Sequence, residues 1–126
     1  MIAYLDTNVA VWLAQGALHR LSPQAEQAVE KADLLISPIV LVELEYLYEV
    51  HRIKLPSQDV FVKLQHEIGL RICDLAFTSI ASVTVGEKWT RDPFDRIIVA
   101  HAKANGLAPL VSADQEIQQH YLRTIW

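Results

Sequence analysis

Residues 2–8 read Ile2-Ala3-Tyr4-Leu5-Asp6-Thr7-Asn8, an apolar run that ends in a carboxylate. A short, uninterrupted apolar run bounded by polar residues predicts a buried strand over residues 2–5. Thr7 or Asn8 can then open a short helix from Val9 to Ala14. A buried strand followed at once by a helix indicates an α/β fold rather than a helical bundle or a β-sandwich.

The rest of the chain repeats this alternation of short apolar runs and helical patterns. Further strands are predicted over residues 34–36, 71–75, 110–111 and 124–126. Helices are predicted from Ser22 to about Ala32, from Ser37 to about Ile53, from Ser57 to near Gly69, less regularly up to about Val85, from Asp92 to Asn105, and from about Gln115 to Tyr121. We therefore predict a single α/β domain over residues 1–126, with a central parallel sheet of about five strands flanked by helices.

The composition is that of a folded domain with a well-developed core. The chain has 126 residues, of which 52% are hydrophobic and 21% are charged, so one domain is expected and disorder is not. Cys73 is the single cysteine and cannot form an intramolecular disulfide, which favours a reducing cytoplasm. The N-terminal residues lack the pattern of a secretory signal, and no apolar run approaches the length of a membrane span. We expect a cytoplasmic protein without a membrane partner.

The formal net charge of −4 argues against binding nucleic acid through a generally basic surface. Lys88, Arg91, Arg96 and Lys103 nevertheless lie close to Asp95 in the sequence. They could contact phosphate groups, or they could be ordinary solubilising surface residues. Composition alone does not separate these two interpretations.

Four acidic residues stand where the local pattern does not ask for a charge: Asp6, Glu43, Asp95 and Asp114. Asp6 and Asp114 each follow a predicted strand, where parallel strands place binding groups at one edge of the sheet. Glu43 lies within an apolar stretch of a predicted helix, so its carboxylate must be turned outward or have a specific role. A buried carboxylate is unfavourable unless it is paired, hydrogen-bonded or bound to a metal.

Three of these acids also have simple structural explanations. Asp92 can cap the helix that begins at Pro93, and Asp95 then occupies the third helical position, where an acid favours the helix dipole. Asp114 could likewise be the N-cap of the last helix, and Asp6 could cap the first. Asp92 could also reach a metal through water. Taken one at a time, these acids do not define a site.

Taken together, the four acids predict a site for a hard divalent cation. Carboxylates brought to one edge of a sheet repel one another unless protons or cations offset their charge. Oxygen ligands suit Mg²⁺ or Mn²⁺. Zinc is disfavoured because the five histidines show no ligand spacing (His19, His51, His66, His101 and His120).

The order of these motifs resembles that of PIN-domain ribonucleases, and most closely the VapC-type toxins of toxin–antitoxin pairs. The resemblance is carried by Leu5-Asp6-Thr7-Asn8, by Ser37 followed by Glu43, by Asp92-Pro93-Phe94-Asp95-Arg96, by Val111-Ser112-Ala113-Asp114 and by the ending Thr124-Ile125-Trp126. Each motif is short, but the ordered set spans nearly the whole chain.

The resemblance implies a Mg²⁺- or Mn²⁺-dependent endoribonuclease acting on RNA. Asp6, Glu43 and Asp95 match the three core acidic residues of that family, and Asp114 matches the fourth, as catalytic and metal-binding residues. Further positions match residues near the substrate: Thr7, Asn8, Arg96 and Ser112. Asn8 stands where close relatives often have histidine, and Ser112 where the family often has threonine. The resemblance also implies a cognate antitoxin and a homodimer.

Other functions remain open at this level. A receiver-like signalling domain is disfavoured because Thr7 follows Asp6 where a second acid is needed, and no lysine follows Leu110-Val111. A phosphatase with Asp6 as nucleophile would want an acid at the position of Asn8. The main alternative is a catalytically silent module that binds RNA or protein.

The long central helix carries Tyr46, Leu47 and Tyr48, more apolar surface than one buried face needs. These side chains could form an interface between subunits. They could equally fill the core.

Overall fold

The computed structural model describes all residues 1–126, and its centre is an all-parallel, five-stranded sheet. The strand order is β3-β2-β1-β4-β5. The strands are β1 (Ile2–Leu5), β2 (Asp33–Ile36), β3 (Arg71–Ile72), β4 (Leu110–Val111) and β5 (Thr124–Ile125). The central strand β1 is flanked by β2 on one side and β4 on the other, so the direction of winding reverses at β1, as in open α/β folds that bind ligands at this point.

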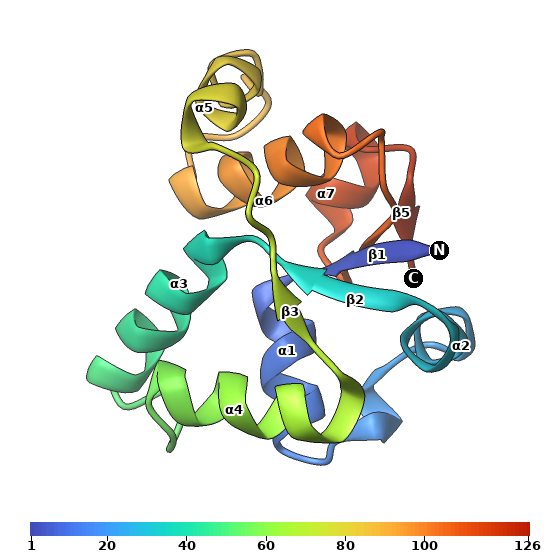
Figure 1. Cartoon of the computed structure of the whole chain (residues 1–126), viewed down its shortest axis with the longest axis vertical. Coiled ribbons are helices and arrows are strands. Elements are labelled where there is room, and N and C mark those ends of the chain that lie inside the picture. The colour runs from blue at the N-terminus through green and yellow to red at the C-terminus, as the bar shows by residue number, and fades with distance from the viewer.

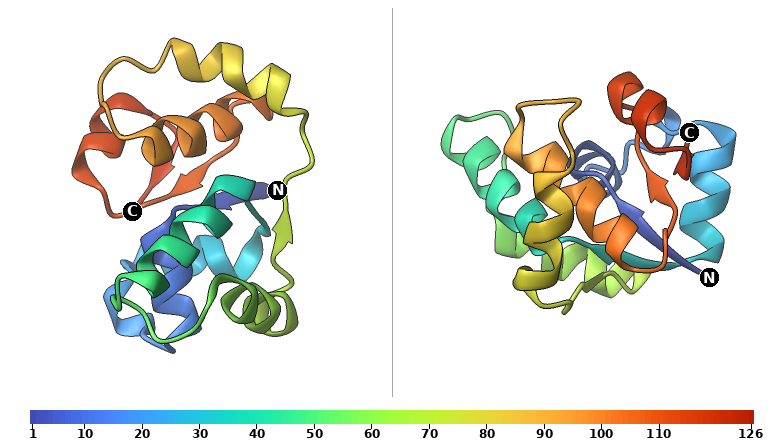
Figure 2. Two further views of the ribbon diagram at one scale, coloured as in Figure 1. Left: turned by 90° about the vertical axis from the view of Figure 1, so that its left-hand side faces the viewer. Right: turned by 90° about the horizontal axis from the view of Figure 1, so that it is seen from above.

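Helices cover both faces of the sheet (Figure 1). They are α1 (Thr7–Ala14), α2 (Pro23–Lys31), α3 (Pro38–Glu49), α4 (Ser57–Ile68), α5 (Phe77–Val85), α6 (Pro93–Ala104) and α7 (Gln115–His120), with a 3₁₀ turn at Leu18–Arg20. Figure 2 shows α5 and α6 stacked on the side of the sheet opposite α1 and α4. The predicted single α/β domain with a five-stranded parallel sheet is confirmed.

Three helices begin where local sequence signals place them. The side chain of Ser22 caps α2, that of Ser37 caps α3 and that of Asp92 caps α6, and each is followed by proline at the first helical position. Gly69 ends α4 with φ of 66°, in the left-handed region that glycine adopts without steric penalty. Short-range hydrogen bonds and backbone sterics thus define these boundaries.

Other boundaries differ from expectation. The first helix begins at Thr7, with Asp6 as its N-cap, rather than at Val9 with Thr7 or Asn8 as the opening residue. The helix from Ser37 ends at Glu49 and not near Ile53, because the chain turns into the left-handed region at His51, where φ is 62°. The third strand pairs only over Arg71–Ile72, since it is the edge strand and has a single neighbour. Ser57 is the first residue of α4 rather than its cap.

The core lies on both faces of the central strands and consists of buried aliphatic side chains around Tyr4. Tyr4, Leu5, Ile36, Ile98 and Leu110 are fully buried. Burial raises the pKa of the Tyr4 phenol, and its hydroxyl donates to the sulfur of Cys73. None of the helices combines the length and apolar character needed to span a membrane.

Candidate metal centre at the carboxyl edge of the sheet

Asp6 lies at the carboxyl end of the central strand, and its side chain is held by two hydrogen bonds. Its Oδ1 accepts from the backbone N–H of Thr7 at 2.8 Å, and its Oδ2 accepts from the hydroxyl of Ser112 at 2.6 Å. The residue is 6% exposed. Burial raises the pKa of the Asp6 carboxyl, and the two hydrogen bonds partly offset this effect. The carboxylate is therefore fixed in orientation at the point where the winding reverses.

Glu43 projects from α3 toward the same edge. The hydroxyl of Thr7 donates a short hydrogen bond to Oε1 of Glu43, which joins the start of α1 to the middle of α3. Burial raises the pKa of Glu43, the Thr7 bond lowers it, and the negative charges of Asp6 and Asp92 raise it further. Glu43 is thus half-buried and lies within electrostatic reach of Asp6.

Asp95 is brought to this edge by the first turn of α6. Asp92 caps the helix, with its Oδ1 accepting from the N–H of Phe94 at 2.8 Å. The carboxyl of Asp95 has no hydrogen-bond donor, and burial together with the charges of Asp92, Asp6, Asp114 and Glu43, in falling order, raises its pKa to about 8. Asp92 is therefore explained as the N-cap of α6. Asp95 instead lies within electrostatic reach of four other acids.

Asp114 completes the group from the loop between β4 and α7. Its Oδ1 accepts from the N–H of Ile117 at 3.0 Å, so it is the N-cap of α7. Its backbone N–H donates to the Ser112 hydroxyl at 3.1 Å. The charge of Asp114 raises the pKa of both Asp6 and Asp95, so the cap residue is also electrostatically part of the group.

The fold therefore brings together all four acids singled out in the sequence, and adds Asp92. The donor set consists of carboxylate oxygens that repel one another, which fits a hard divalent cation better than a soft metal. No group of three or more histidine, cysteine or acidic side chains already stands in metal-binding geometry.

The residues considered as substrate contacts fall into two classes. Thr7 and Ser112 are buried, with their hydroxyls bonded to Glu43 and Asp6. Asn8 is exposed, and Arg96 is half-buried, with its Nε donating to the carbonyl of Thr90 at 2.7 Å. Arg96 forms no ion pair with Asp92.

The basic residues near Asp95 in the sequence have separate surroundings in the structure. Lys103 forms an ion pair with Glu87, with 2.5 Å between Nζ and Oε1, and the Glu87 side chain is 4% exposed. The indole N–H of Trp89 donates to the other carboxylate oxygen of Glu87 at 2.6 Å. Lys103 is therefore a structural residue and not a free surface cation. Glu87 and Trp89 are not recognisable from the sequence, since only the fold brings α6 against the loop before it.

The histidines include one core residue with a defined partner. His101 is 2% exposed, and its Nδ1 lies 2.7 Å from the Ser37 hydroxyl. Burial lowers the pKa of His101, and a contact with the Ile97 carbonyl partly offsets this. His120 stacks on the ring of Trp89 with 5.1 Å between centroids. Neither histidine is placed with the acids.

A cavity of about 460 Å³ adjoins Glu43 on the side of α1. Asn8, Trp12, Arg20 and Arg52 are among its lining residues. The two arginines were not identified from the sequence, because they come from the 3₁₀ turn and from the α3–α4 loop and share no local motif with Glu43.

Comparison with known proteins finds one matching family model and solved structures with a similar fold. The sequence matches the PIN domain family model over residues 3–121. No curated protein matches the sequence. Among solved structures, the chain is similar to one in a toxin–antitoxin complex from Klebsiella pneumoniae, with a TM-score of 0.68, 20% identity and coverage of 98% of this chain and 96% of the other. It is also similar to one in VapBC2 from Rickettsia felis bound to a DNA fragment from their promoter, with a TM-score of 0.63, 22% identity and the same coverage of both chains.

The family match covers nearly the whole domain and includes each of the acids at the sheet edge. The solved structures share its fold from end to end. With its five-stranded parallel sheet and the carboxylates at the carboxyl edge, the chain belongs to the PIN domain family.

Proposed function

We propose that this chain is a divalent-metal-dependent endoribonuclease that hydrolyses RNA phosphodiester bonds and acts as the toxin of a toxin–antitoxin pair. The observation that carries the proposal is the gathering of Asp6, Glu43, Asp92 and Asp114 within electrostatic reach of Asp95. Such a group is unfavourable for folding without a cation, which argues for a functional reason to keep it. Membership of the PIN domain family supports nuclease chemistry.

In this proposal Asp6, Glu43, Asp95 and Asp114 hold Mg²⁺ or Mn²⁺, directly or through water. The bound ion would lower the pKa of an attacking water and offset negative charge on the phosphate. Ser112 and the Thr7 N–H orient Asp6, and the Thr7 hydroxyl orients Glu43. Glu43 either binds the ion or positions the water. Asn8 and Arg96 remain candidates for contact with the substrate.

Cleavage of RNA by the purified protein tests this function. A fluorescent RNA pool should be cut in Mn²⁺ or Mg²⁺ and left intact in EDTA. The Asp6→Asn variant should lose cleavage, whereas Asp74→Asn, which changes an exposed aspartate before α5, should retain it. Equal cleavage by wild type and Asp6→Asn in EDTA would sink the mechanism. Binding of RNA in Mn²⁺ without any cleavage would favour the silent binding module.

The partners in this proposal are an antitoxin and a second copy of the chain. One of the similar solved structures is a toxin–antitoxin complex and another is VapBC2 bound to promoter DNA, which supports a cognate antitoxin here. Tyr46 is 52% exposed and Tyr48 is 38% exposed on α3, so these rings do not fill the core. Leu47 does pack against it. Exposed aromatic groups on this helix support a homodimer.

Sedimentation or light scattering at micromolar concentration tests the dimer. A Tyr46→Glu variant should shift the molar mass toward that of a monomer, while Glu49→Gln on the same helix should not. A monomeric wild-type protein would contradict the homodimer. The cytoplasmic location remains a prediction, consistent with a buried and unpaired Cys73.

A further inference from the structure

Two cavities of the protein adjoin along helix α1 and form one groove. The cavity beside Glu43, of about 460 Å³, and a second of about 560 Å³ share Val11, Gln15, Arg52 and Ile53 as lining residues. We call this continuous depression the α1 groove. It lies between α1, the loop joining α3 to α4, and the first turns of α4.

The α1 groove leads away from the carboxylates. One end is lined by Asn8 and Glu43, and the shared lining residues Val11 and Gln15 continue along the same face of α1. From Asn8 to Gln15 that face extends about 10 Å, given a rise of 1.5 Å per residue. A chain held in the groove would therefore enter the site at Glu43 rather than pass it at a distance.

The charges on the groove are nearly all positive. Arg20, Arg52, Lys54 and Lys63 line it, and Glu43 is the only acidic residue in the lining of either cavity. This concentration of cations occurs in a chain with a formal net charge of −4. It is the charge pattern that a polyanion requires, and it is opposite to that of the protein as a whole.

Most of these cations are not paired with acidic side chains within the fold. Arg20, Arg52 and Lys54 form no ion pairs, and only Lys63 has an acidic neighbour, Glu67, at 4.0 Å on an exposed part of α4. The guanidinium carbon of Arg20 lies 4.8 Å from the centroid of the Trp12 ring, which holds this charge against the wall of the groove. The cations are therefore available to a ligand.

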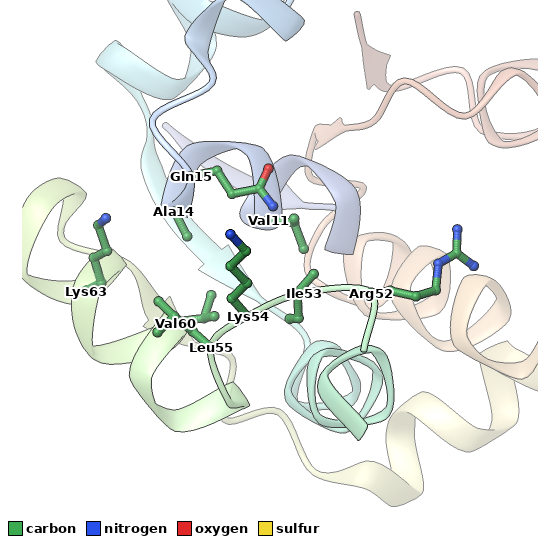
Figure 3. A pocket seen from close by; sticks show the side chains of 9 residues that line it. All are labelled: Val11, Ala14, Gln15, Arg52, Ile53, Lys54, Leu55, Val60 and Lys63. Atoms are coloured by element: carbon green, nitrogen blue, oxygen red, sulfur yellow. The ribbon is translucent and has the colours of Figure 1, made fainter. Parts of the chain in front are cut away.

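Apolar surface alternates with these charges. Figure 3 shows the Lys54 side chain directed between α1 and α4, toward Val11 and Gln15, with Val60 and Leu55 beneath it. Arg52 points away from Lys54, on the other side of Ile53. Cations spaced between apolar walls suit single-stranded nucleic acid. Its phosphates bind cations, and its unpaired bases pack against apolar surfaces.

We propose that the α1 groove binds the single-stranded segment of RNA adjoining the phosphodiester bond that is cut. The inference rests on the proposed ribonuclease function and adds the track by which the substrate approaches. Arg52, which lines both cavities, and Lys54, which lines the cavity farther from Glu43, contact backbone phosphates on opposite sides of Ile53. Arg20 neutralises the phosphate nearest to Glu43.

Equilibrium binding without cleavage tests the track. The probe is a short, unstructured, fluorescein-labelled RNA oligonucleotide, measured by anisotropy in EDTA over a range of NaCl concentrations. The test variant is Arg52→Gln/Lys54→Gln. Its matched control is Lys31→Gln/Arg71→Gln, which removes the same charge from exposed positions at the end of α2 and on the edge strand β3.

The test variant should raise Kd roughly tenfold at 0.15 M salt and lower the slope of log K against log salt by about 1.4, at about 0.7 per phosphate contact on a single strand. The control should bind as the wild type does. Equal affinity and slope in both variants would overturn the proposal and leave the groove to a protein partner. Equal weakening in both would also overturn it, since binding would then follow net charge alone.

The two levels of the proposal fail separately. If Arg52→Gln/Lys54→Gln loses RNA binding and the wild-type protein cuts no RNA in Mn²⁺, the track is supported and the nuclease is contradicted. If the wild-type protein cuts RNA in Mn²⁺ and this variant binds RNA as tightly as the wild type, the nuclease is supported and the track is contradicted. A folded far-UV circular dichroism spectrum for both variants ensures that binding and not folding is compared.

Discussion

The hydroxyl of Ser112 donates a hydrogen bond of 2.6 Å to Oδ2 of Asp6, and so joins the ends of strands β4 and β1 across 106 positions of sequence. Both residues are buried, so the bond is shielded from water. The same hydroxyl accepts from the N–H of Asp114. One buried side chain thereby sets the position of two acids at the candidate metal centre.

Removing that hydroxyl should weaken the metal centre more than the fold. We expect Ser112→Ala to lower Mn²⁺ affinity or cleavage roughly 10- to 100-fold, as is typical when a group that orients a ligand is lost. Mn²⁺ titration by calorimetry, together with the cleavage assay, measures this. Ser112→Thr keeps the hydroxyl and should restore most of the affinity. If alanine and threonine variants behave alike, the orienting role of Ser112 is wrong.

Replacing Asp95 should stabilise the metal-free protein at alkaline pH. Burial and neighbouring acids raise the pKa of this carboxyl to about 8, so its ionisation opposes folding. The stability that depends on a protonated Asp95 is fully present below the ordinary pKa, near 4. It is lost as the pH rises to about 8. In EDTA at pH 9, Asp95→Asn should therefore have a higher free energy of unfolding than the wild type, and the difference should shrink toward pH 4.

Mn²⁺ provides the control for this prediction. The ion should raise the melting temperature of the wild type and raise that of Asp95→Asn less, because a cation binds the folded state through these acids. A metal-free Asp95→Asn protein that is less stable than wild type at pH 9 would mean that the acids do not repel one another in solution.

His101 should make the core sensitive to acid. Burial lowers its pKa below the ordinary value, so the unfolded chain takes up a proton more readily than the folded one. The stability that depends on neutral His101 is present above about pH 6.5 and is lost as pH falls. The stability difference between wild type and His101→Gln in urea should thus decrease from pH 7.5 to pH 5.

The ion pair between Glu87 and Lys103 should matter for stability because one partner is buried. Lys103→Met would leave the Glu87 carboxylate without its cation, and we expect a loss of about 3 kcal/mol, at the low end for buried pairs because Lys103 is partly exposed. Glu87→Gln/Lys103→Met should recover part of this loss. Lys63→Met, which removes an exposed pair with 4.0 Å between Nζ and Oε1 of Glu67, should change stability by less than about 1 kcal/mol. Urea unfolding distinguishes these cases, and equal effects at both lysines would contradict the argument.

Much of the candidate site could be anticipated from local pattern. Asp6 and Asp114 follow apolar strand segments, and parallel strands bring such positions to one edge. Asp92 and Asp95 follow from the cap and proline before α6. Glu43 was recognisable because a charge inside an apolar helical stretch needs a partner. The partner itself, Thr7, could not be deduced, since no local signal relates a hydroxyl in α1 to a carboxylate in α3.

The helix starts at Ser22, Ser37 and Asp92 follow from local sequence, because caps and prolines act within a few residues. Three other relationships depend on the packed fold: the bond of Ser112 to Asp6, the pairing of Lys103 with Glu87, and the groove that Arg20 and Arg52 share. These relationships join separate elements, and their energies depend on burial and distance, which exist only once the sheet has formed and its helices have packed.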